Sequence, residues 1–395
     1  MSDAASVQLR VIADLSLIAA DAWDACANPQ GAVYNPFLSH AFLLAMEQSG
    51  SAIAETGWQA QHLVLENTAG ETLGVMPLYL KNHSQGEYIF DYGWADAFHR
   101  AGGSYYPKLL SAIPFTPAGG RRLLVKSGPD AQTHKTQLIA GALTLLERLG
   151  ASSLHINFLP ETDWETLGEQ GFLQRTDQQF HWQNDGYDSF DAFLQALASR
   201  KRKNLRKERA KALENGIEVD WLTGDTLTDA HWDAFFHFYM DTGHRKWGTP
   251  YLTRDFFTRM QDTMRDDILL IMAKRDGAYI AGALNFIGGD TLFGRNWGCI
   301  EDHPFLHFEL CYYQAIDFAI ARGLKRVEAG AQGTHKLARG YAPHRTYSTH
   351  YITHEGLREA VGQYLESERQ YVDNDISVLS KHTPFKKTAE GEQDD

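Results

Sequence analysis

The chain has 395 residues, of which 43% are hydrophobic and 22% charged, a composition typical of a globular protein with two domains of ordinary size. Its net charge of −13 argues against attraction of nucleic acid or anionic lipid by the whole surface, but does not exclude one local basic site. Three cysteines without CxxC spacing exclude a disulfide framework and argue against a cysteine-built zinc site. The sequence shows neither a secretory signal nor a membrane-length apolar stretch, so we expect a cytoplasmic protein.

The first half predicts an α/β arrangement. Residues 62–80 read as a β-hairpin, because two apolar segments flank a turn at Ala69-Gly70. An apolar-periodic helix is expected at 135–149, ended by Gly150 and followed by a strand at 154–158. Between the hairpin and the helix lies an insert at about 81–123, rich in Gly, Tyr, Phe and Pro. Long inserts are often functional; the alternative is a packed structural loop.

A strongly basic helix is predicted at residues 198–215. Eight Lys or Arg residues fall between Arg200 and Lys211, against the single acid Glu208, and Gly216 can end the helix. We expect this helix to bind a polyanion such as tRNA, and the alternative is an ordinary solvated surface. The residues expected to bind it are Lys201, Arg202, Lys203, Arg206 and Lys207.

The second half repeats the order of the first. Residues 269–287 read as a hairpin with a turn at Asp276-Gly277, and a helix at 309–322 ends at Gly323 before a strand that begins at Val327. Gly150 and Gly323 are 173 residues apart, as are Leu154 and Val327. This pattern predicts two domains related by internal duplication, at 1–184 and 185–380, and a disordered tail at 381–395.

Six segments spread over the chain resemble one family of proteins. They are residues 86–91, 105–108, 113–117, 200–209, 305–313 and 328–341. The sequence resembles the tandem GNAT-fold acyltransferases of the Fem type, which move aminoacyl groups from tRNA onto peptidoglycan precursors. Within them it looks like the branch labelled peptidoglycan biosynthesis/recognition proteins. The resemblance implies two tandem GNAT-like domains and an N-acyltransferase, possibly one that acts on a cell-envelope acceptor.

One Fem feature can be placed by residue. In those enzymes a strand ends in a Gly-containing turn that is followed by a Phe-Lys pair and a Phe-Gly, and the Lys helps to hold negative charge near the reacting acyl group. Here the strand is 326–330, the pair is His335-Lys336 and the downstream element is Gly340-Tyr341. The resemblance therefore implies a catalytic role for Lys336, although His335 replaces the Phe and the Phe-Gly order is not kept.

Acyl transfer to an amine requires removal of a proton, stabilisation of an oxyanion and alignment of the two substrates. We expect Lys336 and backbone amides near residues 330–333 to stabilise the oxyanion. Glu328, Glu309, His307 and His335 are candidate bases, each with a structural role as the alternative. Substrate contacts are expected from Arg295, Asn296, Trp297, His307, Arg339, Tyr341, Asp91, Tyr105 and Lys108.

The donor is left open between aminoacyl-tRNA and acyl-CoA as a co-substrate, and no tightly bound cofactor is expected. The segment from Arg295 to Ile300 lacks the last small residue of a typical coenzyme A pyrophosphate loop. The histidines of the second half match no standard metal spacing, so no metal site is expected. The acceptor is expected to be a small or peptide-like amine. Two alternatives are a non-catalytic recognition protein that uses the same cleft and an RNA-binding protein that uses the basic helix. The sequence does not indicate an oligomeric state.

Overall fold

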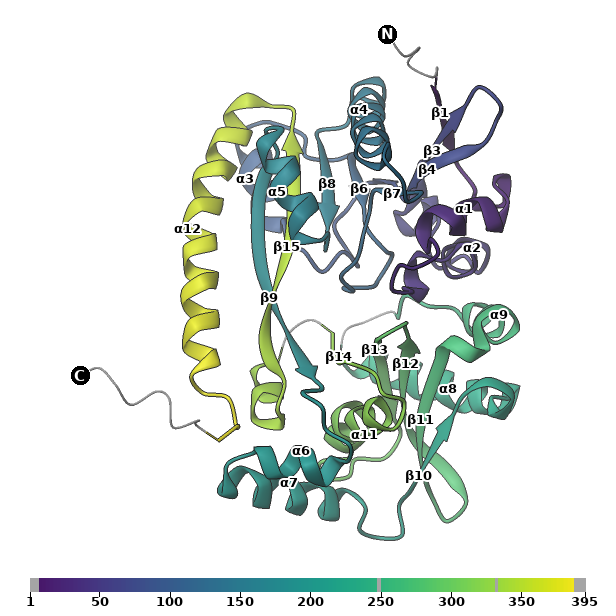
Figure 1. Cartoon of the computed structure of the whole chain (residues 1–395), viewed down its shortest axis with the longest axis vertical. Helices are drawn as coiled ribbons and strands as arrows, with labels where there is room; N and C mark the ends of the chain where they lie inside the picture. The colour runs from purple at the N-terminus through teal and green to yellow at the C-terminus, as the bar shows by residue number, and fades with distance from the viewer. Residues whose placement is uncertain (1–6, 247–249, 331–332, 387–395) are drawn as a thin grey trace, which may run out of the picture. The chain divides into compact units, whose positions relative to one another are not determined.

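A computed structural model describes residues 7–246, 250–330 and 333–386 (Figure 1). The chain divides into two compact units, each assembled from three stretches of sequence. The first unit contains residues 1–177, 251–264 and 346–372, and the second contains residues 178–250, 265–345 and 373–395.

Two sheets form the framework of the first unit. The antiparallel sheet has the order β1-β3-β4-β7, with β1 (Val7–Ile12), β3 (His62–Asn67), β4 (Thr72–Met76) and β7 (Leu124–Val125). The other has the order β15-β8-β6-β5-β2, with β2 (Gln59–Ala60), β5 (Tyr79–Lys81), β6 (Lys108–Ser111), β8 (Ser153–Asn157) and the later part of β15 (Ala342–Ile352). Within this second sheet β6 and β8 run parallel, and the other pairs are antiparallel.

Apolar helix faces cover the sheets of the first unit. The helix α4 (Ala131–Leu149) buries Leu138, Ala142 and Leu146, whose spacing of four residues places them on one face. Gly150 ends this helix with φ of 61°, a conformation that glycine adopts without a Cβ penalty. The other helices of this unit are α1 (Ala20–Ala27), α2 (His40–Gln48), α3 (Tyr92–Arg100), α5 (Glu161–Glu169), α9 (Arg254–Met264) and most of α12 (Glu355–Ser380).

The second unit contains one sheet with the order β10-β11-β12-β13-β14-β9. Its strands are β10 (Glu218–Leu222), β11 (Ile268–Arg275), β12 (Ala278–Ile287), β13 (Thr291–Cys299), β14 (Arg326–Glu328) and the later part of β9 (Leu173–Gln183). Only the β13–β14 pair is parallel among the paired strands that the structure describes in this unit.

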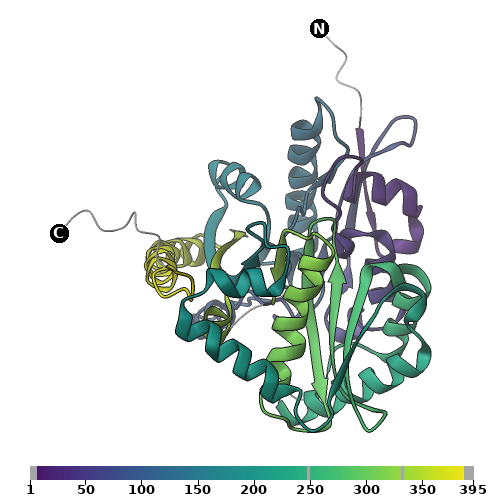
Figure 2. The same cartoon turned by 60° about the horizontal axis from the view of Figure 1, so that its bottom comes forward.

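Helices also flank the sheet of the second unit. The helix α11 (Gln314–Ala321) packs on β13 and β14 (Figures 1 and 2). A π-helical turn, Glu309–Tyr313, leads into it from the short helix α10 (Leu306–Phe308). Other helices of this unit are α6 (Phe190–Ala196), α7 (Ser199–Ala212), α8 (Asp229–Lys246) and a 3-10 helix, Thr334–Arg339. Among the described helices of both units, none has the length and apolar character needed to span a bilayer.

Several predicted elements are confirmed. β3 pairs with β4 and β11 pairs with β12, so both predicted hairpins contain antiparallel strands. The predicted helix before Gly150 is α4, and the helix before Gly323 is the continuous run from α10 to α11. The predicted basic helix at 198–215 is α7, which is shorter than expected.

The observed units differ from the predicted domains 1–184 and 185–380. Residues 346–372 belong to the first unit because β15 pairs with β8 there, from Ser348 to Ile352. Within the predicted tail at 381–395, Phe385 forms a β-bridge with Leu197 and packs on the core of the second unit. The rest of that tail, 387–395, lies outside the described residues.

Candidate active site

In the second unit the parallel strands β13 and β14 are paired at first and then separate from each other. Their last registered pair is Phe293 with Glu328, where β14 ends, whereas β13 continues to Cys299. Gly330 follows with φ of 75°, so the chain turns directly after the strand. A Cβ on Gly294 would lie 3.5 Å from the Glu328 carbonyl oxygen, so the two backbones still approach closely at this point. Beyond it, the later half of β13 carries three predicted substrate residues, Arg295–Trp297, all partly buried.

Lys336, in the 3-10 helix Thr334–Arg339, contacts the backbone just after β14. Its Nζ donates to the carbonyl oxygens of Ala329 at 2.7 Å and of Gly330 at 3.0 Å. The side chain is 3% exposed, and burial lowers the Lys336 pKa to about 8. Near neutral pH the amine therefore stays mostly protonated, and the structure places a positive charge where the two strands part.

A group of aromatic and imidazole rings lies beside Lys336. The Tyr312 hydroxyl and His335 Nε2 are 2.9 Å apart, and the His335 ring stacks on Phe308. The His307 ring meets Trp297 edge-on, with centroids 5.1 Å apart, and also contacts Tyr312 and His335. Burial, together with the charges of Lys336 and Arg339, lowers the His335 pKa, so this imidazole is neutral near pH 7 and can accept a proton.

Two other predicted bases, Glu309 and Glu328, lie among charged and polar side chains and not among the rings beside Lys336. Glu309 is fully buried and accepts hydrogen bonds from the Arg209 guanidinium and from Gln314 Nε2. These contacts tie Glu309 to α7 and to the first residue of α11. Glu328 lies buried at the end of β14, with Oε1 3.3 Å from Nε of Arg326.

Arg339 and Tyr341 pack against this group of rings. Arg339 donates to the His335 carbonyl oxygen and to Glu208, and its guanidinium carbon lies 3.5 Å from the Phe308 ring centroid. Tyr341 is fully buried and donates to the Tyr312 carbonyl oxygen at 3.2 Å. These contacts connect both residues to the rings of the site. Their predicted contact with a substrate stays a prediction.

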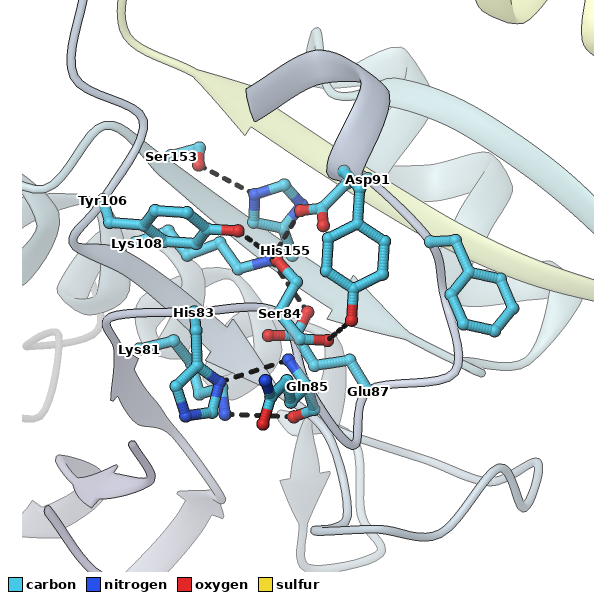
Figure 3. A network of polar contacts seen from close by, with 12 residues as sticks. Lys81, His83, Ser84, Gln85, Glu87, Asp91, Tyr106, Lys108, Ser153 and His155 are labelled. Carbon is cyan, nitrogen blue, oxygen red and sulfur yellow. Dashed lines mark hydrogen bonds and ion pairs between the residues drawn. The ribbon is translucent and has the colours of Figure 1, made fainter. Parts of the chain in front are cut away.

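A second cluster, in the first unit, contains Asp91, Tyr105 and Lys108. Figure 3 shows Asp91 and Lys108 with the residues around them. Lys108 Nζ reaches Ser84 at 2.7 Å, Glu87 at 2.8 Å and Asp91 at 2.5 Å, and the Tyr105 hydroxyl donates to Asp91. All five side chains are buried. Burial would raise the Asp91 pKa, but the Lys108 charge outweighs it and the pKa is lowered, whereas burial raises the Glu87 pKa to about 7.

More titratable groups extend this buried cluster. Lys81 Nζ lies 3.6 Å from the Trp58 ring centroid, and burial lowers the Lys81 pKa to about 7. The Nδ1 atoms of His155 and His350 are 2.6 Å apart, and burial lowers the pKa of both imidazoles. The predicted insert at 81–123 thus contributes most of a buried ionic network, and Lys108 binds three residues of its first loop.

The basic residues of α7 divide between two environments. Lys203, Arg206 and Lys207 are exposed, and Lys201 and Arg202 are partly exposed. Arg209, in contrast, turns inward to Glu309 and Asp317, and Leu205 and Ala212 bury the inner face. Of the five predicted polyanion residues, Arg206 pairs with Asp191 at 3.0 Å and Arg202 donates to Gln195 at 2.9 Å, while Lys203 and Lys207 are exposed.

The sequence interpretation missed several residues of both clusters. Tyr312 and Phe308 lie within the segment 305–313 that carried the family resemblance, and Glu87 lies within 86–91, but no spacing rule links them to His335 or Lys108. Lys81 and His350 were not predicted as members of a buried cluster, because that membership depends on burial and on strand pairing.

The comparisons with known proteins agree with this architecture. The FemX crystal structure is 15% identical, with a TM-score of 0.55 over 87% of this chain and 98% of that chain. The C-terminal domain of a putative lysylphosphatidylglycerol synthetase from Agrobacterium fabrum is 7% identical, with a TM-score of 0.54 over 88% and 95% of the two chains. L-PGS from Bacillus licheniformis is 8% identical, with a TM-score of 0.51 over 85% and 98%. At these identities the likeness shows the fold alone.

The predicted α/β fold and the predicted Fem-type resemblance are both confirmed. A search of curated proteins finds no match to this chain. A family model covers residues 14–387, nearly the whole sequence. The chain belongs to the FemAB-like family, described as peptidoglycan biosynthesis/recognition.

Proposed function

We propose that this protein is an N-acyltransferase that moves an acyl or aminoacyl group onto an amine of a peptidoglycan-related acceptor. The observation that carries the proposal is the Lys336 ammonium at the point where β13 and β14 part, beside the neutral imidazole of His335. Family membership supports the acceptor class. The donor is a co-substrate, either aminoacyl-tRNA or acyl-CoA, and we place the reaction in the cytoplasm.

In the proposed reaction the amine nitrogen attacks the carbonyl carbon of the donor, and the bond from that carbon to the leaving group breaks. In the tautomer in which His335 Nε2 donates to the Tyr312 hydroxyl, Nδ1 holds a lone pair and can take the proton that the amine loses. The Lys336 charge lies beside the region where negative charge develops on the carbonyl oxygen. The leaving group takes up the proton that His335 received, so the imidazole returns to its neutral form.

The basic helix supports a polyanionic donor. Lys203, Arg206 and Lys207 are exposed on α7, while the same helix is tied to the core by Arg209. A fixed helix that presents several cations can bind successive phosphates, and tRNA carries such an array. We therefore place aminoacyl-tRNA ahead of acyl-CoA as the donor.

A second candidate function is recognition without transfer. It is favoured by the burial of Lys336, whose amine already serves two backbone carbonyls. In that case the same region binds an envelope precursor and no bond is formed.

The test has two parts. Thermal unfolding with acetyl-CoA, longer acyl-CoAs, aminoacyl-tRNA and nucleotide-sugar precursors identifies ligands, because a ligand that binds only the folded state raises Tm. Each stabilising donor and acceptor are then incubated together, and mass spectrometry detects the acylated amine. A product supports the transferase. Stabilisation by the precursor without product supports recognition, and the absence of both contradicts the two proposals.

A further inference from the structure

We propose that the first unit holds a separate ligand site, a pocket of about 340 Å³ between α3 and α12 that binds a neutral apolar group about the size of a fused two-ring system. The pocket lies wholly within the first unit, and the proposal does not depend on the transferase function.

The pocket has apolar walls and a partly open rim. Trp94, Leu357 and Val361 are buried and form its inner surface. Phe90 and Tyr364 also line it, yet they are 47% and 52% exposed. Concave apolar sites with aromatic linings are the usual places where small molecules bind.

The lining is electrically neutral. Arg175 is the one charged residue that lines the pocket, and its Nε and Nη2 each lie 2.7 Å from a carboxylate oxygen of Glu368. Its Nη1 donates to the Phe90 carbonyl oxygen, and the Tyr364 hydroxyl donates to Glu368. Because the guanidinium charge is already balanced, a charged ligand would lose hydration without gaining a partner. The pocket therefore favours a neutral group.

Contacts outside the pocket fix the positions of Trp94 and of the loop that carries Phe90. The Trp94 ring stacks on His155 and meets His350 edge-on, with the latter centroids 5.0 Å apart. The loop that carries Phe90 is fixed on one side by Arg175 and on the other by Lys108, through Asp91. A preformed pocket spares the ligand the free energy needed to order its own site.

The volume sets the ligand size. An apolar cavity of roughly 150 Å³ accepts benzene. The present pocket has a volume of about 340 Å³ but is partly open to solvent, so this volume is the most that a bound group can occupy within it. Two fused rings or an aliphatic group of similar volume fit within that limit. Ala97 and Ala360 face it with small side chains, one from each helix.

The experiment uses the full chain and the neutral fluorescent probe N-phenyl-1-naphthylamine, titrated at a fixed protein concentration. We expect saturable enhancement of its fluorescence, with the naphthyl group in the pocket. The variant Ala97→Phe/Ala360→Phe places two rings in the pocket and should reduce the probe affinity about tenfold or more. Both alanines are exposed, so the variant should keep the wild-type circular dichroism.

The matched control is Gln370→Phe, which adds the same ring to an exposed position of α12 outside the pocket lining. It should keep wild-type affinity. If the double variant does not fold, the single variant Ala360→Phe takes its place. Equal affinity of the filled variant and the wild type, or no saturable binding to the wild type, would overturn the proposal. Equal affinity for the anionic 1-anilinonaphthalene-8-sulfonate would overturn the preference for a neutral ligand.

Discussion

Two buried lysines show how similar side chains serve different ends in this protein. Lys108 is fully buried and faces two carboxylates and a hydroxyl. Lys336 is nearly as buried but faces two backbone carbonyls, which carry only partial charge. The carboxylates raise the Lys108 pKa despite its burial, whereas burial lowers that of Lys336. We therefore expect Lys108 to matter for stability and Lys336 for chemistry.

Replacing Lys108 by Met should lower the free energy of unfolding by about 3–5 kcal/mol, because it leaves two carboxylates buried without their cation. Urea unfolding followed by circular dichroism measures this change. Adding Glu87→Gln and Asp91→Asn to the variant should restore much of the loss, since the uncompensated charges are then removed. A loss below about 1 kcal/mol in Lys108→Met would show that the ion pairs contribute little.

Replacing Lys336 by Met should slow the transfer reaction by about 100-fold or more, in the range found when one donor to a developing oxyanion is removed. The assay is the mass-spectrometric detection of acylated amine under single-turnover conditions. The control is Lys325→Met, since Lys325 is 79% exposed. Transfer at the wild-type rate in folded Lys336→Met would remove this lysine from the proposed mechanism.

At the scale of elements, α7 has one face that is anchored to the core and one exposed basic face. Its inner face buries Leu205 and Ala212, and Arg209 bridges to Glu309 and Asp317. The outer face carries exposed cations. Because one face is fixed and the other solvated, charge reversal on the outer face should alter binding without unfolding the helix.

The double variant Lys203→Glu/Lys207→Glu should weaken binding of a nucleic-acid donor and flatten its salt dependence. Each phosphate neutralised contributes a log–log slope of about −0.7 to −0.9, so losing two contacts should reduce the slope by about 1.4–1.8. Affinity measured from 50 to 300 mM salt, roughly spanning the physiological range, tests this. If the double variant keeps the wild-type affinity and slope for every ligand that the protein binds, the helix is an ordinary solvated surface. The Tm of the double variant should equal that of the wild type in either case, because exposed charges contribute little to stability.

For the whole molecule, buried histidines set the response to acid. Burial lowers the pKa of His155, His181 and His350 below that of an unfolded histidine. Below pH 6.5 the unfolded chain therefore binds protons that the folded chain does not, so stability is lost as pH falls. Glu87 acts in the opposite direction between pH 4.5, the ordinary pKa of its carboxyl group, and about 7, its raised pKa, because the folded state there holds the extra proton.

The net expectation is that the free energy of unfolding falls on acidification from pH 7.5 to 5.5, at up to about 3 kcal/mol per pH unit below 6.5. Urea unfolding at a series of pH values measures the slope. The variant Glu87→Gln should steepen it, since the opposing proton is removed. A free energy of unfolding that is flat or rises toward pH 5.5 would contradict the assignment of neutral buried histidines.

The sequence by itself determined the local elements and the family. Apolar periodicity and terminal glycines located α4, α11 and both hairpins, and the motifs spread over the chain indicated the Fem type. The resemblance to the Fem type also pointed to Lys336, which follows a strand and a glycine turn as the matching Lys of that family does. These features depend on residues that are neighbours in the sequence, so their spacing and residue types are enough to predict them.

Only the tertiary structure decided what depends on burial and on long-range pairing. Glu309 and Asp91 look alike as carboxylates in the sequence, yet one faces Arg209 and the other Lys108. The return of 346–372 to the first unit follows from the pairing of β15 with β8, almost 200 residues away in the chain. Desolvation and the distance between charges set each pKa, and neither exists until the chain has folded.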